Sequence, residues 1–348
     1  MFGSSSSSSN NNLPLSQQFQ WEAWLFDSMV QNVPIEHLLA TLKQQGFTQQ
    51  DIENTIQRLA DSPAYVVARQ KQHIIQQHHS RLHIEEQHRR HNTNNTTVLT
   101  EANLTPEGFE YLYHQNQAAY FPKSLEHWPQ IQEWDLDFFE THYGHVEVEA
   151  QVGREANPQY QRDFKSICQR MPLSKVIQSI RKNPTSNDIY LAAKNAPFTN
   201  EGLQSILQSI PTISGILTET YPPETTALWI GPAGTLTQLH HDWCNALFVQ
   251  LHGRKEFTLI PANQAPYVYN RFQRFADVNP KHWDQEQFPL FAHATPQTIV
   301  LEPGDALFIP VGWWHQVESL DVSISMTFSN FIWNNVYPWA FPKESLSY

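Results

Sequence analysis

Two segments far apart in the sequence carry side chains that could bind one metal ion. A His-His-Asp run offers the imidazole of His240 and the carboxylate of Asp242, and His315 follows two tryptophans much later in the chain. Two imidazoles and one carboxylate, with the other coordination positions left open, form the facial triad of non-heme Fe(II) oxygenases. These residues therefore predict an iron site made by His240, Asp242 and His315, and a reaction that uses O2.

The surrounding sequence favours a shared site, although a His-x-Asp tripeptide alone is more often a turn or a core pair. On a strand, the two-residue spacing places His240 and Asp242 on the same face. Further along, a Pro-Gly turn signal precedes the apolar run Ala306 to Ile309, and a second Pro and Gly end that run before His315. This order of turn, buried strand and histidine predicts that the third ligand lies at the mouth of a barrel.

Composition limits the function classes that are open to the chain. With 348 residues, it exceeds one typical domain. The formal net charge of -12 speaks against a nucleic-acid binder, which needs a basic face to neutralise phosphates. No apolar run approaches the roughly 18 residues that span a membrane. The only two cysteines, Cys168 and Cys244, offer no disulfide framework and fit a reducing compartment. We expect a soluble cytoplasmic protein without membrane contact.

The N-terminal quarter of the sequence has a helical pattern. Residues 1–18 include a Ser/Asn tract that is typical of a disordered tail. From Phe19 the apolar spacing predicts a helix, Pro34 opens a second one that ends at Gly46, and Thr48 with Asp51 gives an N-cap signal for a third. Residues 19–91 are therefore expected to form a helical accessory domain.

A histidine-rich segment closes this accessory domain. Residues Ala64 to His91 form a polar helix candidate with few apolar positions, so a solvated helix is favoured over a metal site. The Asn/Thr-rich residues 92–105 that follow are expected to form a linker. The linker separates the accessory domain from a catalytic domain at 106–348.

Short strand-like runs fill the second half of the catalytic domain. Gly and Pro separate six of them, which are Ala227 to Ile230, Ala246 to Leu251, Glu256 to Ile260, Thr298 to Leu301, Ala306 to Ile309 and Val322 to Phe328. Such spacing is typical of a β-sandwich or barrel. We expect a mainly β fold, a jelly roll, with helical additions.

Both metal-ligand segments resemble a known family. The runs TQLHHDWCNALFVQLHGRKEFTLIP and PGDALFIPVGWWHQVESL are similar to the JmjC-type, cupin-fold oxygenases that depend on Fe(II) and 2-oxoglutarate. The resemblance spans Thr105 to Phe331, and is strongest to the branch that includes the asparaginyl hydroxylase inhibiting the hypoxia-inducible factor. It implies a double-stranded β-helix and a requirement for Fe(II), 2-oxoglutarate and O2.

The resemblance also implies which residues bind 2-oxoglutarate. Lys255 matches the lysine that pairs with the distal carboxylate, and a dianion inside a barrel does need a buried cation. Tyr190 and Thr237 match hydroxyl groups that hydrogen-bond the same carboxylate, against the alternative of a core tyrosine and a strand threonine. Asn245 lies one residue out of register with an asparagine near the cosubstrate.

The resemblance leaves several functions open. The first is hydroxylation of a C–H bond in a protein or peptide side chain, with release of succinate and CO2. The second is the same chemistry on a small molecule, and the third is a non-catalytic cupin that binds a metal and a partner. Without paired cysteines for a chromatin-reader zinc motif, histone demethylation is less favoured. The N-terminal helices offer a route to a homodimer.

Overall fold

We analysed a computed structural model that describes residues 15–75, 97–270 and 274–335. The chain divides into two compact units, one formed by residues 1–80 and the other by residues 81–339. In the described ranges, no helix is both long and apolar enough to cross a bilayer. Each unit is described separately below.

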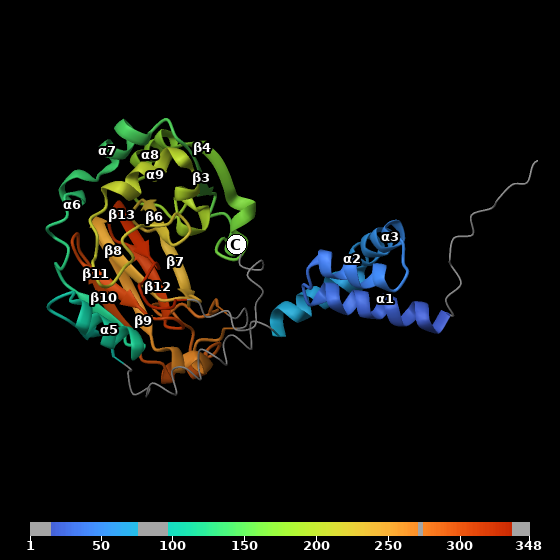
Figure 1. The fold of residues 1–348 in the computed structure, drawn as a ribbon. Coiled ribbons are helices and arrows are strands. Elements are labelled where there is room, and N and C mark those ends of the chain that lie inside the picture. The colour runs from blue at the N-terminus through green and yellow to red at the C-terminus, as the bar shows by residue number, and fades with distance from the viewer. Residues whose placement is uncertain (1–14, 76–96, 271–273, 336–348) are drawn as a thin grey trace, which may run out of the picture. The chain divides into compact units, whose positions relative to one another are not determined.

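The first unit is built from helices. Helix α1 spans Leu15–Val30, α2 spans Ile35–Gln44 and α3 spans Gln49–Ala60 (Figure 1). Helix α1 starts before the expected Phe19, within the segment expected to be a tail. The Thr48 side chain accepts a hydrogen bond from the Asp51 amide, as the N-cap signal predicts. Apolar side chains of all three helices share a small core, which contains Leu25, Met29, Leu38, Leu42 and Ile52.

Only part of the histidine-rich segment can be compared with its prediction. Residues 63–75 are helical, in agreement with the expected start of that helix. Residues 76–91, together with the tail before residue 15, lie outside the described residues. The expected linker at 92–105 is described from residue 97, and it contains the short strand β1, Leu99–Thr100. Strand β1 pairs in parallel with β2, Ala119–Phe121, because the edge of β2 offers free backbone groups.

Two sheets that face each other form the centre of the second unit (Figure 1). The larger has the order β1-β2-β11-β8-β13-β6, and the smaller the order β10-β9-β12-β7. Their remaining strands are β6 Thr226–Gly231, β7 Leu236–His240, β8 Ala246–His252, β9 Lys255–Ile260, β10 Gln297–Leu301, β11 Ala306–Ile309, β12 Trp314–Ser319 and β13 Ser323–Phe328. The expected jelly roll is confirmed, and each of the six expected strands is present.

The larger sheet is buried on both faces. Leu247, Val249 and Leu251 of β8 belong to the main core together with side chains from the covering helices, whereas Phe248 points to the other core, between the sheets. Burial on both faces explains why β8 and β11 read as continuous apolar runs in the sequence. The larger sheet therefore forms one wall of the barrel, and polar residues of the smaller sheet face this wall.

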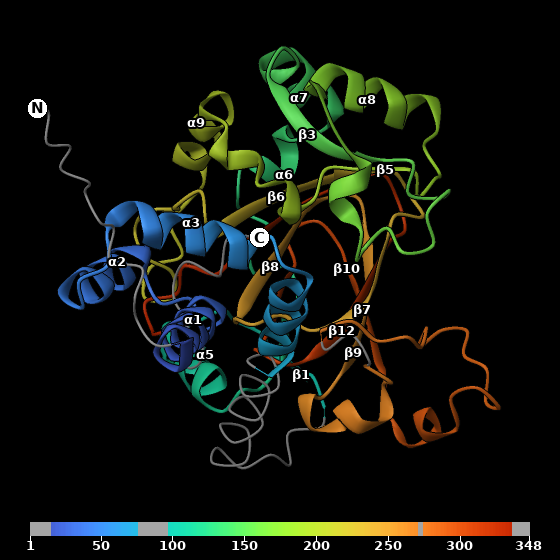
Figure 2. The same ribbon diagram turned by 90° about the vertical axis from the view of Figure 1, so that its right-hand side faces the viewer.

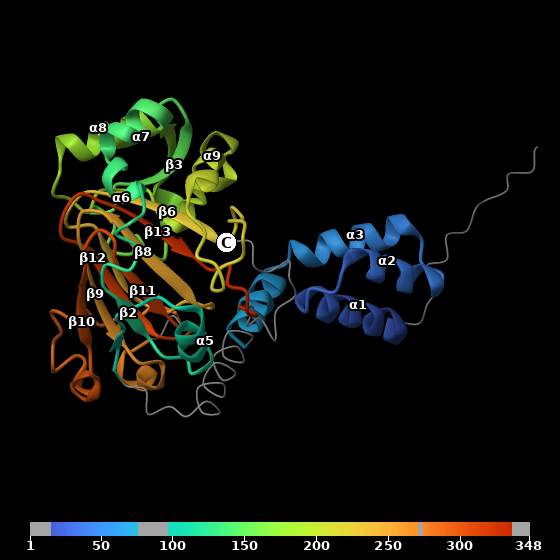
Figure 3. The same cartoon turned by 60° about the vertical axis from the view of Figure 1, so that its left-hand side comes forward.

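Helices and a third sheet cover the barrel. Helices α7, α8 and α9 gather at one end of the two main sheets, and α5 lies near the other end (Figures 2 and 3). The helices are α5 Pro106–His114, α6 Gln130–Glu133, α7 Leu136–Tyr143, α8 Leu173–Lys182 and α9 Glu201–Ser209. The third sheet has the order β4-β3-β5, with β3 Glu147–Val152, β4 Cys168–Pro172 and β5 Ile189–Tyr190. Strand β5 brings Tyr190 to the barrel.

Candidate metal centre

The three expected ligands come together between β7 and β12. His240 is the last residue of β7, and it is the cross-strand partner of His315 on β12. Metal-ligating atoms of His240, Asp242 and His315 all lie within 4.8 Å of one another. Asp242 does not continue the strand as the spacing argument assumed, because β7 ends at His240 and Asp242 lies in the turn that follows. The turn still directs its carboxylate toward both imidazoles.

Backbone contacts hold the two ligand segments together. The Gly312 amide, in the turn before His315, donates to the Asp242 carbonyl at 3.2 Å. The neighbouring Val311 amide donates to the Asn245 side-chain oxygen at 2.8 Å. Asn245 is 1% exposed, so this bond forms in the interior, where an unpaired amide would be costly. The turn that carries Asp242 and the turn that precedes His315 are thus fixed to each other.

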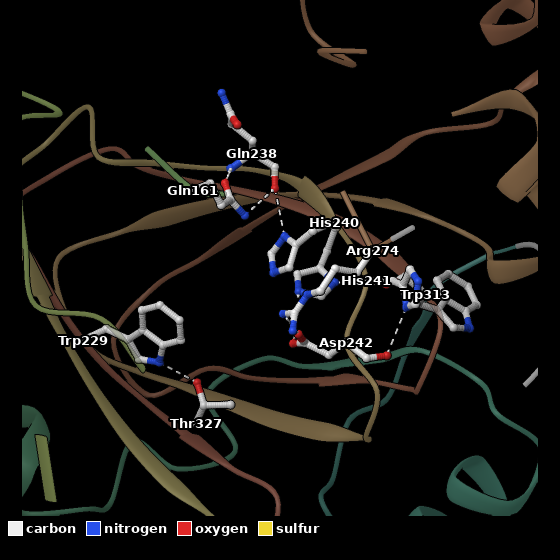
Figure 4. A network of polar contacts seen from close by, with 10 residues as sticks. Gln161, Trp229, Gln238, His240, His241, Asp242, Arg274, Trp313 and Thr327 are labelled. Carbon is white, nitrogen blue, oxygen red and sulfur yellow. Dashed lines mark hydrogen bonds and ion pairs between the residues drawn. The ribbon is translucent and has the colours of Figure 1, made fainter. Parts of the chain in front are cut away.

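Each imidazole is oriented by the backbone carbonyl two residues before it. The His240 Nδ1 lies 2.8 Å from the Gln238 oxygen, and the His315 Nδ1 lies 3.0 Å from the Trp313 oxygen. A carbonyl can only accept, so both Nδ1 atoms carry the proton and both Nε2 atoms are left as ligands. Figure 4 shows the His240 ring, the Asp242 carboxylate and the Arg274 guanidinium side by side.

The charge states of these groups suit metal binding. Burial lowers the pKa of His240 and of His315, which keeps both rings neutral. Burial raises the pKa of Asp242, but Arg274 and the two imidazoles outweigh that effect and hold it below its usual value. An Arg274 nitrogen donates to Asp242 Oδ1 at 2.8 Å. The site therefore presents two neutral imidazoles and one carboxylate anion, the forms in which these groups bind metals.

A pocket between the two sheets leads from the ligands into the barrel. Strands of both sheets line it, with Tyr190, Trp229, Thr237, His240, Asp242, Ala246, Phe248, Phe257, Ile309, His315, Val317 and Thr327. The wall is largely aromatic and aliphatic, and its polar groups are few. Such a lining orients a bound molecule through a small number of polar contacts.

Lys255 lies next to Tyr190, which is one of the residues that line this pocket. Its ammonium is fully buried, donates to the Tyr190 hydroxyl at 3.2 Å and lies 5.4 Å from the centre of the Phe248 ring. No carboxylate of the described residues forms an ion pair with it. Burial lowers the pKa of Lys255 to about 7. A buried cation without a counter-ion indicates that an anionic molecule belongs in the pocket.

Tyr190 lies between Lys255 and Thr237, the two other residues that the resemblance assigns to 2-oxoglutarate. Burial raises the pKa of Tyr190, so its hydroxyl stays protonated, and a side-chain hydrogen bond joins it to Thr237. Gly231 makes room for the ring, since a Cβ at that position would come within 2.6 Å of a Tyr190 ring carbon. Tyr190 thus connects Lys255 to Thr237, and both Tyr190 and Thr237 line the pocket. Asn245 is not among the lining residues, and its assignment as a cosubstrate ligand stays a prediction.

Three features of the site were not predicted from the sequence. Arg274 reaches Asp242 from the long segment between β9 and β10, where no pattern marks it. Trp229 of β6 and Thr327 of the adjacent strand β13 lie side by side on one wall of the pocket, and the indole nitrogen donates to the threonine hydroxyl at 2.7 Å (Figure 4). Both residues lie in expected strands, so the face on which they lie could have been inferred from alternation. Gln161, also shown there, contacts β7 from a loop.

The donor set fits Fe(II) and a 2-oxo acid. Two imidazoles on adjacent strands and a carboxylate in the turn that follows leave room for further ligands on one side of the ion, and nitrogen with carboxylate ligands suits iron. The buried Lys255 ammonium, which donates to the pocket residue Tyr190, matches the remote carboxylate of a dicarboxylic cosubstrate. We therefore assign Fe(II) to the triad and 2-oxoglutarate to the pocket.

Comparison with known proteins agrees with this assignment. The model of the cupin-like domain family matches residues 105–337, which is more than half of the chain. Lysine-specific demethylase 8 of Xenopus tropicalis is 26% identical over 212 residues, which cover 59% of this chain and 46% of that protein. Lysine-specific demethylase JMJ30 of Arabidopsis thaliana is 28% identical over 246 residues, which cover 68% of this chain and 55% of that protein.

A shorter match is to the human HSPB1-associated protein 1, at 37% identity over 110 residues that cover 29% of this chain and 22% of that protein. The chain spans about half the length of the first two relatives. The asparaginyl hydroxylase branch suggested by the motifs is not singled out by these comparisons and stays a prediction. The chain belongs to the cupin-like domain family, and within that family it is similar to JmjC proteins.

Proposed function

We propose that this chain hydroxylates a C–H bond in a side chain of a protein or peptide. One atom of O2 enters the substrate as the hydroxyl oxygen and the other enters succinate, while 2-oxoglutarate loses CO2. The observation that carries the proposal is a complete ligand triad in the lining of a pocket whose Tyr190 accepts a hydrogen bond from a buried lysine, and this lysine has no ion-pair partner among the described residues.

The residues of the triad hold the metal and determine the net charge of its protein ligands. His240 and His315 bind through Nε2 because their Nδ1 atoms are fixed by backbone carbonyls. Asp242 offers Oδ2 to the metal while Arg274 occupies Oδ1. When bound, Fe(II) supplies the O2 activation that couples oxidation of the substrate to decarboxylation of the cosubstrate.

The residues at the lysine end hold the cosubstrate. Lys255 neutralises the distal carboxylate, while Tyr190 and Thr237 donate hydroxyl hydrogen bonds to it. The aromatic wall of Trp229, Phe248 and Phe257 excludes water from the pocket. A cosubstrate held by these residues extends toward the triad, so its 2-oxo group is already positioned beside the metal.

A direct test is turnover by the purified chain. We expect Fe(II), 2-oxoglutarate and a suitable peptide to give succinate together with a peptide that is heavier by one oxygen atom. Asp242→Ala protein is the matched control and should give neither product. Complete lack of succinate from the unaltered protein across peptide and small-molecule panels would contradict the proposal, and would favour a non-catalytic metal-binding cupin.

Demethylation of a methylated lysine is the second candidate, because two relatives are named lysine-specific demethylases. Hydroxylation of an N-methyl carbon gives an N-hydroxymethyl group that releases formaldehyde, so the same site serves both outcomes. Methylated and unmethylated versions of one peptide distinguish them. Formaldehyde from the methylated peptide alone would establish demethylation, whereas a retained oxygen on either peptide would establish hydroxylation.

We further propose that the helical unit serves association and that the protein acts in the cytoplasm. The described helices expose Trp24, Ile35, Val66 and Val67, an apolar surface that a homodimer could cover. The molar mass of the full chain in solution, measured by light scattering, should correspond to two copies. A monomer at micromolar concentration would remove this proposal, and imaging of the tagged chain tests its location.

A further inference from the structure

Strand β7 carries two residues of the site, Thr237 and His240, and its pairing with β12 is irregular. β7 is the last strand of the smaller sheet, and no strand of the described ranges flanks its outer side, where an isolated antiparallel bridge joins His240 to Phe275. On the other side, the pairing with β12 shifts between His315 and Val317, which leaves Gln238 and Leu239 without a register partner. The Leu239 carbonyl accepts from the Ala276 amide at 2.9 Å on the outer side, whereas the Gln238 backbone has no strand partner on either side within the described residues.

A side chain from outside the sheet takes the place of the missing strand at this point. The Gln161 carboxamide nitrogen donates to the Gln238 carbonyl at 3.3 Å, and the Gln238 amide donates to the Gln161 side-chain oxygen at 2.6 Å. The Gln161 side chain thus pairs with both backbone groups of one residue, as a neighbouring strand would. Gln161 is 6% exposed, so few water molecules can substitute for it.

The same carbonyl orients the iron ligand. The Gln238 oxygen accepts from Gln161 and also from the Nδ1 of His240 at 2.8 Å (Figure 4). Movement of this carbonyl turns the His240 ring, because the imidazole has no other hydrogen-bond partner in the described part of the chain. Hydrogen bonds to the second nitrogen of a ligating histidine fix its tautomer and orientation, and their loss typically weakens metal binding.

We propose that Gln161 is a positioning residue of the metal centre, which acts through the Gln238 carbonyl on His240. This inference rests on the proposed function in so far as it places a metal on His240. The contact comes from the segment between β3 and β4, so a part of the chain outside the two main sheets contributes to the site. Gln161 itself does not touch the metal or the substrate.

Cobalt binding to the full-length protein tests this role without turnover. We expect Gln161→Leu, which removes both hydrogen bonds at nearly unchanged volume, to weaken Co(II) binding roughly 10- to 100-fold and to alter the visible Co(II) absorption. Gln159→Leu is the matched control, since Gln159 is an exposed residue of the same loop. It should bind Co(II) within about twofold of the unaltered protein, by the behaviour of surface substitutions.

Gln161→Glu separates a positioning role from a general loss of stability. Glutamate can still accept from the Gln238 amide but cannot donate to the Gln238 carbonyl, so its Co(II) affinity should fall between those of the unaltered protein and Gln161→Leu. It also carries the test if Gln161→Leu does not fold. Co(II) affinity and absorption equal to those of the unaltered protein, in whichever of the two variants is folded, would overturn the inference. Co(II) binding by the unaltered protein, measured first, tests the proposed function separately.

Discussion

At the scale of single residues, the ligands could be predicted from the sequence and their supports could not. His240, Asp242 and His315 are recognisable because metal chemistry demands particular side chains, and Lys255 because a buried anion demands a cation. Arg274 and Gln161 reach the site from loops, where neither residue type nor spacing marks a function. Asn245 was expected near the cosubstrate, and the structure shows its side chain bound to the Val311 amide instead of lining the pocket.

Lys255 should reduce the stability of the empty protein. Its folded pKa of about 7 lies below its ordinary value of 10.5, so between these two pH values the unfolded chain holds a proton that the folded chain lacks. Stability therefore falls as the pH is lowered from 10.5 to 7. We expect Lys255→Met to raise the free energy of unfolding by up to about 4 kcal/mol at pH 7, and by little above pH 10.5.

Urea denaturation of the metal-free protein at both pH values measures this difference. The same variant should lose 2-oxoglutarate binding, since the ammonium proposed to pair with the distal carboxylate is gone. Lower stability of Lys255→Met than of the unaltered protein at pH 7 would show that the ammonium has a stabilising partner and would weaken the argument for an anionic occupant.

At the scale of elements, apolar strands were predictable and the strands that carry the site were less so. The runs of β8 and β11 are evident because both of their faces are buried. β7 and β12 turn Thr237, His240 and His315 toward the pocket, and these polar residues interrupt the apolar pattern that marks a strand. β3, β4 and β5 are short or mixed in polarity, so their sequences resemble loops.

The loop after β3 also supports the cosubstrate end of the pocket. The buried Arg154 guanidinium lies 4.4 Å from the Tyr160 ring centre and 4.9 Å from that of Tyr190, and it donates to the Leu236 carbonyl. Its Nε and Nη1 have no hydrogen-bond partner, so the stacking against the tyrosines is its main interaction. Arg154 thereby fixes the ring whose hydroxyl meets Lys255.

Arg154→Gln should therefore weaken 2-oxoglutarate binding and spare the metal. We expect a roughly 5- to 30-fold higher Kd for 2-oxoglutarate, which corresponds to the 1 to 2 kcal/mol of a desolvated cation–π contact. Calorimetric titration of the Co(II)-loaded protein measures it, and Arg162→Gln in the same loop is the control. Equal losses of Co(II) and 2-oxoglutarate affinity would point to general disorder instead.

At the scale of the whole molecule, the division into a helical part and a barrel follows from the change of hydrophobic period along the sequence. All described residues of the metal site and its pocket lie within residues 81–339. We propose that the catalytic domain is self-sufficient for ligand binding. The N-terminal helices are then dispensable for ligand binding. Their exposed apolar residues are the basis for the proposed association.

A chain that begins at residue 97 tests this proposal, because it keeps β1 paired with β2. We expect it to bind Co(II) and 2-oxoglutarate within about twofold of the full chain, as independent domains do. Calorimetric titration of both chains provides the comparison. If the shortened chain folds but binds Co(II) or 2-oxoglutarate more than tenfold more weakly than the full chain, part of the site belongs to the helical unit.

The central claim is that three side chains bind one iron atom that a 2-oxo acid can reach within the same pocket. Anaerobic titration of the protein with Fe(II) and then with 2-oxoglutarate tests this most directly, since a 2-oxo acid that chelates ferrous iron gives a visible charge-transfer absorption. We predict that this absorption saturates at one equivalent of Fe(II) in the unaltered protein and is lost in Asp242→Ala and Lys255→Met. No absorption in the unaltered protein, or an unchanged absorption in Asp242→Ala, would contradict the account.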